Sequence, residues 1–408
     1  MVVNSQHEAE IILEFEPTVA IPDHLTSEIQ SKLAYVDERI IHAEVQANLI
    51  TLQLKDQNVL SNTIQQEIEA KVQQVVISMA KGAIRPKIQI LEDHLARPTI
   101  YQEDPMEELF ERGEVKRESS GIYVLGPLIA RLIEYFEQQF LKLADSFGAH
   151  PYRIPTLIPA KALERVQYFS AFPHSLTFAS HLREDLEAID DFARNAVCDD
   201  RGLNVSQDSF AQIKALLSPA VCYHIYLALA DKPLPNDQVI ATAVGNCFRY
   251  ESINLLSLER MWNFTMREVI FVGSKDFVLE NRETARLRMK SFFDKIGFAY
   301  RVESANDPFF IGEFRKQAAF QSAFQLKFEI SAALPFKEST LAVGSYNYHQ
   351  DFFGRNLKIS LSDGSPVHTG CAAFGLERIA FAFLAQYGFA MDEWPHDVRT
   401  FLEEQAKR

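Results

Sequence analysis

The chain has 408 residues, of which 47% are hydrophobic and 24% are charged, and its formal net charge is −14. This composition is typical of a folded globular protein and excludes a disordered chain. The acidic balance argues against a protein that mainly binds nucleic acid, because phosphate binding needs clustered Lys and Arg. The four cysteines form no CxxC pair, and the first residues lack signal-peptide features, so we expect a cytoplasmic protein. No run of about eighteen apolar residues predicts a membrane span.

Residues 1–95 are predicted to form a separate accessory domain. Apolar residues alternate at Ile11, Leu13 and Phe15, as in a strand, and helical spacing follows at residues 25–33. Further strands are expected at residues 41–45, 50–54 and 87–91, with a second helix over residues 60–82 and a turn at Asn48. The order βαββαβ predicts a ferredoxin-like sandwich. Without cysteines or an aromatic cluster, this domain is interpreted as an assembly or docking module.

A charged connector is expected over residues 96–120, ahead of a catalytic domain over residues 121–408. Gly126 and Pro127 precede a long amphipathic pattern that continues to Leu143, which predicts a helix. An extended segment with a closing proline follows at residues 151–159. On composition alone this helix-then-strand order is weak evidence for any particular fold.

The stretch from Cys247 to Gly273 predicts a β-hairpin, because its apolar and polar residues alternate. The alternation places Arg249 and Glu251 on one strand face. A guanidinium beside a carboxylate suits a polyanion that also carries a hydrogen-bonding base. Taken alone, a solvated charged face explains this pattern better, because charge on an exposed sheet face is the usual arrangement.

Residues 369–384 combine small side chains with a helix that starts near Glu377 and Arg378. Small residues allow a nucleotide to approach the backbone closely, and an arginine at the start of a helix can bind phosphate together with the backbone amides. This segment therefore predicts a second part of a nucleotide site.

Three residues could form a metal site: Cys222, Glu268 and Cys371. Two thiolates and a carboxylate make a three-ligand zinc site with one open position, which suits a catalytic metal. Each cysteine taken singly is better explained as a small buried hydrophobe. Cys198 and Cys247 are interpreted as structural.

These motifs resemble those of class II aminoacyl-tRNA synthetases. Phe248-Arg249-x-Glu251 with Arg260-x-x-x-Phe264 is similar to motif 2, the segment around Arg378 to motif 3, and residues 127–159 to motif 1, the dimer element. In motif 3, Ala373 stands where glycine is common. From about residue 100 onward, the stretches RIPTLIP, YFSAFP, SYNYHQDFFG and GCAAFGLERIAF look like the amino acid–carrier-protein ligases, which are truncated relatives of the atypical zinc-dependent seryl-tRNA synthetases. The resemblance implies an α+β fold, with an antiparallel sheet and flanking helices, and a homodimer.

The resemblance also implies residue roles. Arg249 would contact the α-phosphate of ATP, Glu251 the adenine and Arg378 the γ-phosphate, while Arg260 and Phe264 would complete the ATP site. Arg249, Arg260 and Arg378 would be the catalytic residues. Cys222, Glu268 and Cys371 match the order of zinc ligands in the atypical synthetases, which strengthens the zinc hypothesis. Ser345, Asn347 and Glu329 would bind substrate. Leu341 lies where the synthetases carry a metal-binding Glu, so Mg²⁺ would fall to Glu329 or Asp351.

The predicted function is activation of glycine, alanine or serine with ATP, followed by transfer to the phosphopantetheine thiol of a carrier protein. No tRNA or membrane partner is expected. A basic patch for the carrier is predicted in the helix after the hairpin, with Arg282, Arg286, Arg288, Lys290 and Lys295. Two rival interpretations are an atypical zinc-dependent seryl-tRNA synthetase and a catalytically silent synthetase paralogue.

Overall fold

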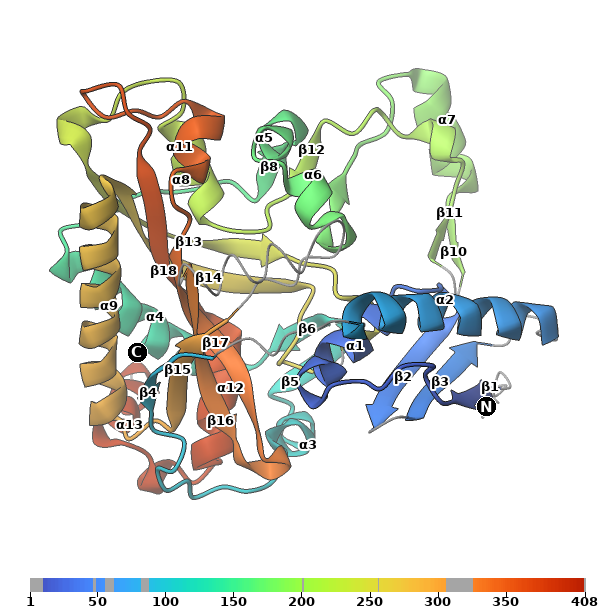
Figure 1. The fold of residues 1–408 in the computed structure, drawn as a ribbon, viewed down its shortest axis with the longest axis horizontal. Coiled ribbons are helices and arrows are strands. Elements are labelled where there is room, and N and C mark those ends of the chain that lie inside the picture. The colour runs from blue at the N-terminus through green and yellow to red at the C-terminus, as the bar shows by residue number, and fades with distance from the viewer. Residues whose placement is uncertain are drawn as a thin grey trace.

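The computed structural model describes residues 10–46, 49–55, 62–81, 88–199, 202–255, 257–305 and 326–406. An eight-stranded sheet dominates it, with helices on both faces, and a smaller three-stranded sheet lies to one side (Figure 1). Within the described ranges, no helix is both long and apolar enough to cross a membrane.

The large sheet has the strand order β4-β15-β16-β17-β18-β14-β13-β7. All neighbours pair antiparallel except β13 and β7. In sheet order its strands are β4 (Ile90–Asp93), β15 (Tyr300–Ser304), β16 (Lys327–Leu334), β17 (Ser339–Tyr348), β18 (His368–Gly375), β14 (Asn263–Gly273), β13 (Val239–Phe248) and β7 (His150–Pro151). The predicted α+β architecture with an antiparallel sheet is confirmed.

Two hydrophobic cores cover the two faces of this sheet, because adjacent residues of a strand point to opposite sides. One core packs the sheet against α4 (Pro127–Ser146), α9 (Lys275–Lys295), α12 (Leu376–Tyr387) and α13 (His396–Ala406). The other packs it against α5 (Ala160–Arg165), α8 (Cys222–Ala228) and α11 (Phe352–Leu357). The second face carries the candidate site.

Shorter elements surround the large sheet. One ribbon pairs β5 (Val115–Ser119) with β6 (Ile122–Leu125), and another pairs β10 (Val197–Asp199) with β11 (Gly202–Asn204). A three-stranded sheet has the order β8 (Leu157–Pro159), β12 (Ala215–Leu217), β9 (Phe178–Ala179). The remaining short helices are α3 (Pro105–Glu111), α6 (Tyr168–Ala171) and α7 (Leu186–Asn195).

The N-terminal unit contains β1 (Glu10–Phe15), α1 (Thr26–Leu33), β2 (Ile40–Gln46), β3 (Leu49–Lys55) and α2 (Asn62–Ala80). Its three strands have the order β1-β3-β2 and share a hydrophobic core with both helices. These five elements match the prediction, while the expected turn residue Asn48 lies outside the described residues.

The prediction that a fourth strand completes this unit was wrong. The strand β4 joins the large sheet and pairs with β15 instead. The reason is the buried carboxylate of Glu92, which accepts a hydrogen bond from the Tyr300 hydroxyl and forms an ion pair with Arg286. A buried carboxylate requires such partners, and both lie in the main body of the protein.

The charged connector is a folded part of the main body. Asp104 caps α3 by accepting a hydrogen bond from the Met106 amide at 2.9 Å. Leu109 of α3 and Val115 of β5 are buried in the main core. The proposed domain boundaries at residues 95 and 120 stay a prediction.

Candidate functional site

Strand register collects the predicted site residues on one face of the large sheet. Ala373 of β18 lies opposite Glu268 of β14 on one side and Ser345 of β17 on the other. Ser345 in turn lies opposite Glu329 of β16. Since residues directly across a ladder point to the same side, these side chains form one row. Cys371 and Asn347, two residues further along their strands, lie opposite each other on the same face.

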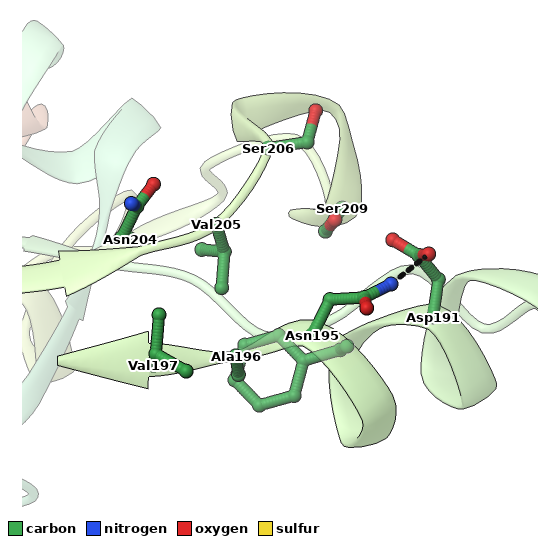
Figure 2. A pocket seen from close by; sticks show the side chains of 9 residues that line it. Asp191, Asn195, Ala196, Val197, Asn204, Val205, Ser206 and Ser209 are labelled. Carbon is green, nitrogen blue, oxygen red and sulfur yellow. Dashed lines mark hydrogen bonds between the residues drawn. The ribbon is translucent and has the colours of Figure 1, made fainter.

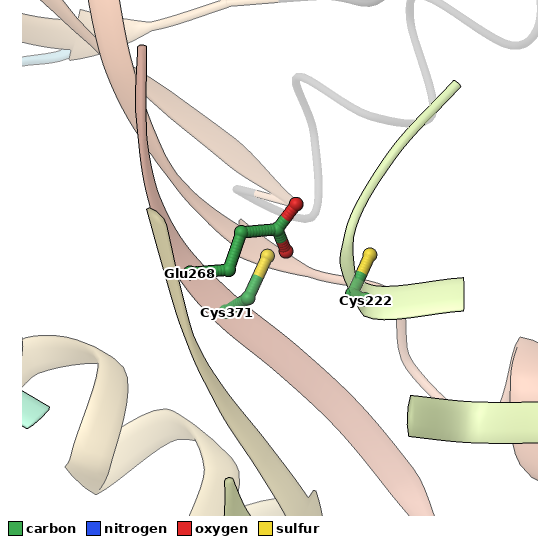
Figure 3. A group of neighbouring side chains, drawn as sticks. All are labelled: Cys222, Glu268 and Cys371. Carbon is green, nitrogen blue, oxygen red and sulfur yellow. The ribbon is translucent and has the colours of Figure 1, made fainter. Parts of the chain in front are cut away.

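Cys222, Glu268 and Cys371 converge on this face (Figure 3), as the sequence predicted. One ligand atom from each lies within 4.8 Å of the others, and all three residues are buried. Glu268 and Cys371 come from adjacent strands, whereas Cys222 begins α8, which packs above them. We call these three residues the Cys–Glu–Cys group.

The carboxylate of Glu268 is half satisfied. Its Oε1 accepts a hydrogen bond from the Val221 amide at 3.2 Å. Its Oε2 is buried and has no conventional hydrogen-bond partner within the part of the chain that the structure describes. A buried, unpartnered carboxylate oxygen facing two thiols is costly unless a cation binds there.

The three ligating groups resist ionisation without a cation. A hydrogen bond with Cys371, burial and the nearby Glu268 carboxylate all raise the pKa of Cys222. Burial likewise raises the pKa of Glu268, against the opposing effect of both thiols and the Val221 amide. A divalent metal would reverse this preference, because it stabilises thiolate and carboxylate together. The donor set therefore fits zinc.

Two predicted substrate residues lie beside the Cys–Glu–Cys group. Asn347 donates from Nδ2 to Cys371 Sγ at 3.4 Å and to Ser345 Oγ at 2.9 Å.

Glu329, in the same row as Ser345, forms an ion pair with Lys327 at 2.8 Å. Asp351, the other magnesium candidate, precedes α11 and forms an ion pair with Arg355.

Four charged groups, which we call the ATP cluster, lie together: Arg249, Glu251, Arg260 and Arg378. Arg260 forms an ion pair with Glu251. Burial raises the pKa of Glu251, but Arg260, Arg378 and Arg249 outweigh that effect and hold it below its ordinary value. Three guanidinium groups around one carboxylate leave a net positive site, which suits a polyphosphate.

The backbone around Arg249 and Glu251 differs from the prediction. Strand β13 ends at Phe248, and both residues lie in the connection to β14 rather than on a strand face. The Arg249 Nε donates to the Pro219 carbonyl at 3.0 Å, and its guanidinium lies 5.5 Å from the Phe264 ring centre. Arg378 Nη1 donates to the Ala342 carbonyl at 3.2 Å. Side-chain contacts rather than strand alternation thus place these groups.

Two further features of the site were not predicted from the sequence. The carboxylate of Glu377 is buried and accepts the Thr265 amide on both oxygens, at 2.8 and 3.0 Å, which fixes the start of β14 beside Arg378. The available signal was a glutamate directly before Arg378, the predicted phosphate-binding arginine. The second feature is the backbone of residues 219–221, which contacts both Arg249 and Glu268. These contacts could not be predicted, because no side-chain type indicates where a backbone group will bind.

The basic residues of the predicted patch on α9 all have partners within the chain. Arg286 pairs with Glu283 and Glu92, Lys290 with Asp294, and Lys295 with Asp397. Arg288 donates to the Ser146 hydroxyl and carbonyl, and Arg282 lies over the Phe328 ring. All five side chains have partners within the chain, yet Lys295 keeps 65% of its side chain exposed, so their part in docking a carrier protein stays a prediction.

A separate surface pocket of about 240 Å³ lies between α7 and the β10–β11 ribbon (Figure 2). Its walls include Asp191 and Asn195, which hydrogen-bond at 2.7 Å. None of the predicted site residues lines it. The pocket is therefore distinct from the site on the large sheet.

The chain is similar to several known proteins, although no family model matches it. Amino acid–acyl-carrier-protein ligases 1 and 2 of Bradyrhizobium diazoefficiens are each 31% identical to it; the matches cover 73% of this chain and 90% and 88% of those proteins. The type-2 serine–tRNA ligase of Methanopyrus kandleri is 25% identical over 78% of this chain and 63% of that protein. The M. kandleri seryl-tRNA synthetase, solved with a tRNA, shares the fold with a TM-score of 0.70 at 22% identity, covering 97% of this chain and 77% of that one.

Proposed function

The chain belongs to the family of amino acid–acyl-carrier-protein ligases, and on that premise we propose that it activates a small amino acid with ATP and transfers it to a carrier-protein thiol. The observation that carries the proposal is the position of the Cys–Glu–Cys group beside the ATP cluster. The segment 219–221 links the two, because it hydrogen-bonds Glu268 of one and Arg249 of the other.

Cys222, Glu268 and Cys371 would hold Zn²⁺. The unpartnered Glu268 Oε2 and the two thiols supply a carboxylate and two sulfurs, which leaves a fourth position for substrate. Bound there, zinc would act as a Lewis acid toward the α-amine of the amino acid. Asn347 and Ser345, which adjoin Cys371, would contact the amino acid's side chain and so select a small residue.

The ATP cluster would carry out adenylation by positioning and charge neutralisation. The amino acid carboxylate would attack the α-phosphate, and pyrophosphate would leave. Arg249 and Arg260 would neutralise charge at the α-phosphate and along the chain of phosphates, while Arg378 would bind the γ-phosphate. The Glu251 carboxylate would accept a hydrogen bond from the amino group of adenine, and the Phe264 ring would pack against the base. Mg²⁺ would accompany the nucleotide, with Glu329 of the sheet row or Asp351 as its protein ligand.

The acceptor we propose is the phosphopantetheine thiol of a carrier protein. The thiol would attack the carbonyl of the aminoacyl adenylate, and AMP would leave with its phosphate accepting the thiol proton. Similarity to the two carrier-protein ligases covers most of their length, whereas the match to the M. kandleri serine–tRNA ligase covers 63% of that protein. We further propose that the protein is a homodimer. We also propose a cytoplasmic location, with which four cysteines that form no disulfide are consistent.

ATP–pyrophosphate exchange with a panel of amino acids tests this function. Exchange that depends on glycine, alanine or serine is the expected result. An enzyme that exchanges with none of the twenty amino acids would favour the silent-paralogue alternative. The matched negative control is Arg249→Ala, which retains the fold-forming residues of β13 and β14 but loses the proposed α-phosphate contact.

A further inference from the structure

The residue before Glu251 is held through both of its backbone polar groups. The Tyr250 amide donates to the Ser175 carbonyl at 3.1 Å, and its carbonyl accepts the Tyr35 hydroxyl at 3.2 Å. Ser175 belongs to the main body, whereas Tyr35 follows α1 in the N-terminal unit. The Tyr35 ring also packs edge-on against His174, with 5.3 Å between ring centres. Tyr35 of the N-terminal unit therefore contacts both Tyr250 and His174, the residue before Ser175 in the main body.

Two more contacts join the N-terminal unit to the same connection, next to the yellow β13–β14 hairpin (Figure 1). Ser252 Oγ donates to the Ala34 carbonyl at 3.4 Å. The side chain of Ile253 packs against the hydrophobic core of the N-terminal unit. Residues 250, 252 and 253 thus all contact this unit, and Glu251 lies between them.

The backbone at Ser252 requires this support. Its φ is 54°, in the left-handed region that a residue with a side chain rarely adopts. Such a conformation persists when surrounding contacts over-determine it, and here several of those contacts come from the N-terminal unit. Without them, the connection would relax and the Glu251 carboxylate would move relative to Arg249 and Arg378.

We propose that Tyr35 is a positioning residue for nucleotide binding, through which the N-terminal unit holds Glu251 in the orientation that recognises the adenine of ATP. The inference rests on the proposed ATP site. It assigns to the N-terminal unit a task within the adenylation site, in addition to any role in docking a partner.

The first test compares Tyr35→Phe with the unaltered full-length chain. The substitution keeps the ring on His174 and removes one hydrogen bond to the Tyr250 carbonyl. We expect the KM for ATP in pyrophosphate exchange to rise about two- to tenfold, the range for loss of a single hydrogen bond. The KM for the amino acid and the zinc content should not change. Ser252→Ala should shift the KM for ATP in the same direction.

The matched control is Ser78→Ala, which removes a serine-to-carbonyl hydrogen bond of 2.7 Å within α2, where Ser78 donates to Val75. It should leave the KM for ATP unchanged. If Tyr35→Phe and Ser252→Ala behave like this control, the inference is overturned. An equal rise of both substrate KM values with a lowered Tm would also overturn it, because that pattern indicates a merely structural role.

A direct measurement of nucleotide binding separates this inference from the proposed function. Calorimetric titration with MgATP reports the Kd whether or not an amino acid is activated. An unaltered chain that binds MgATP but exchanges no pyrophosphate would contradict the proposed function alone, and a weaker Kd in Tyr35→Phe would still support the role of Tyr35. An unaltered chain that does not bind MgATP would contradict both.

Discussion

The backbone amide of Val221 donates to the carboxylate of Glu268 at 3.2 Å, across 47 residues of sequence. Two residues earlier, the Pro219 carbonyl accepts Arg249 Nε at 3.0 Å. One short segment, immediately before Cys222, thus contacts both the Cys–Glu–Cys group and the ATP cluster. The two sites therefore share one backbone segment.

The first prediction concerns the metal. Purified protein should contain about one zinc ion per chain, as expected for a single three-ligand site. Cys222→Ala should lose the zinc and the amino-acid-dependent exchange, because two ligands do not retain the ion. Elemental analysis measures the content. Cys247→Ala is the matched control, since Cys247 is also fully buried but lies outside the group. Full activity in metal-free protein would refute the assignment.

The second prediction concerns phosphate binding. Arg249→Ala and Arg378→Ala should each slow pyrophosphate exchange by roughly 10²–10³, the usual effect of removing one electrostatic stabiliser from an active site. Arg288→Ala serves as the control, because that guanidinium contacts Ser146 and Phe147 on the opposite face of the sheet. Near-normal exchange in both site variants would show that the ATP cluster does not bind the phosphates.

The third prediction concerns Glu251 and pH. The surrounding arginines overcome the effect of burial and hold the pKa of Glu251 below its ordinary value. A depressed carboxyl pKa means that the group titrates only in acid, so the KM for ATP should stay constant between about pH 6 and 8. Glu251→Gln should raise that KM at every pH in this range. Glu259→Gln, which breaks the pair with Lys337 instead, should not. A steep rise in the wild-type KM toward pH 6 would contradict the expected ionisation.

The fourth prediction concerns stability at Glu377. Replacing it with alanine leaves the Thr265 amide without its acceptor in a part-buried position. The free energy of unfolding should fall by about 1–3 kcal/mol, the cost of an unsatisfied buried donor. Urea denaturation measures it. Glu338→Ala, at an exposed turn between β16 and β17, should change the stability much less. Equal losses in the two variants would show that Glu377 does not anchor β14.

The sequence predicted the elements whose pattern is local. The apolar run that ends at Gly273 indicated β14, and the helical spacing after Pro127 indicated α4. The first strand of the predicted hairpin was misplaced, because β13 ends at Phe248. The prediction failed where distant partners decide the outcome. Strand β4 joins the large sheet because Glu92 finds Tyr300 and Arg286 there, and no local pattern contains that information.

The same division applies to the candidate site. Residue type and motif order were enough to single out Cys222, Glu268 and Cys371, which the structure brings together. The ion pairs of α9 with Asp397 and Glu92 could not be predicted from the sequence, because these two residues are remote in sequence from the basic residues that they contact. Backbone contacts such as those of Pro219 and Val221 depend on geometry alone, so no residue type indicates them.

A choice between two acceptors tests the proposed carrier-protein ligase activity most directly. The enzyme is given ATP, its preferred radiolabelled amino acid, a phosphopantetheinylated carrier protein and total tRNA in one reaction. The proposed activity requires label on the carrier protein, in a hydroxylamine-sensitive thioester, and none on a carrier that lacks the phosphopantetheine arm. Label on tRNA and never on the carrier protein would contradict it and favour the seryl-tRNA synthetase alternative.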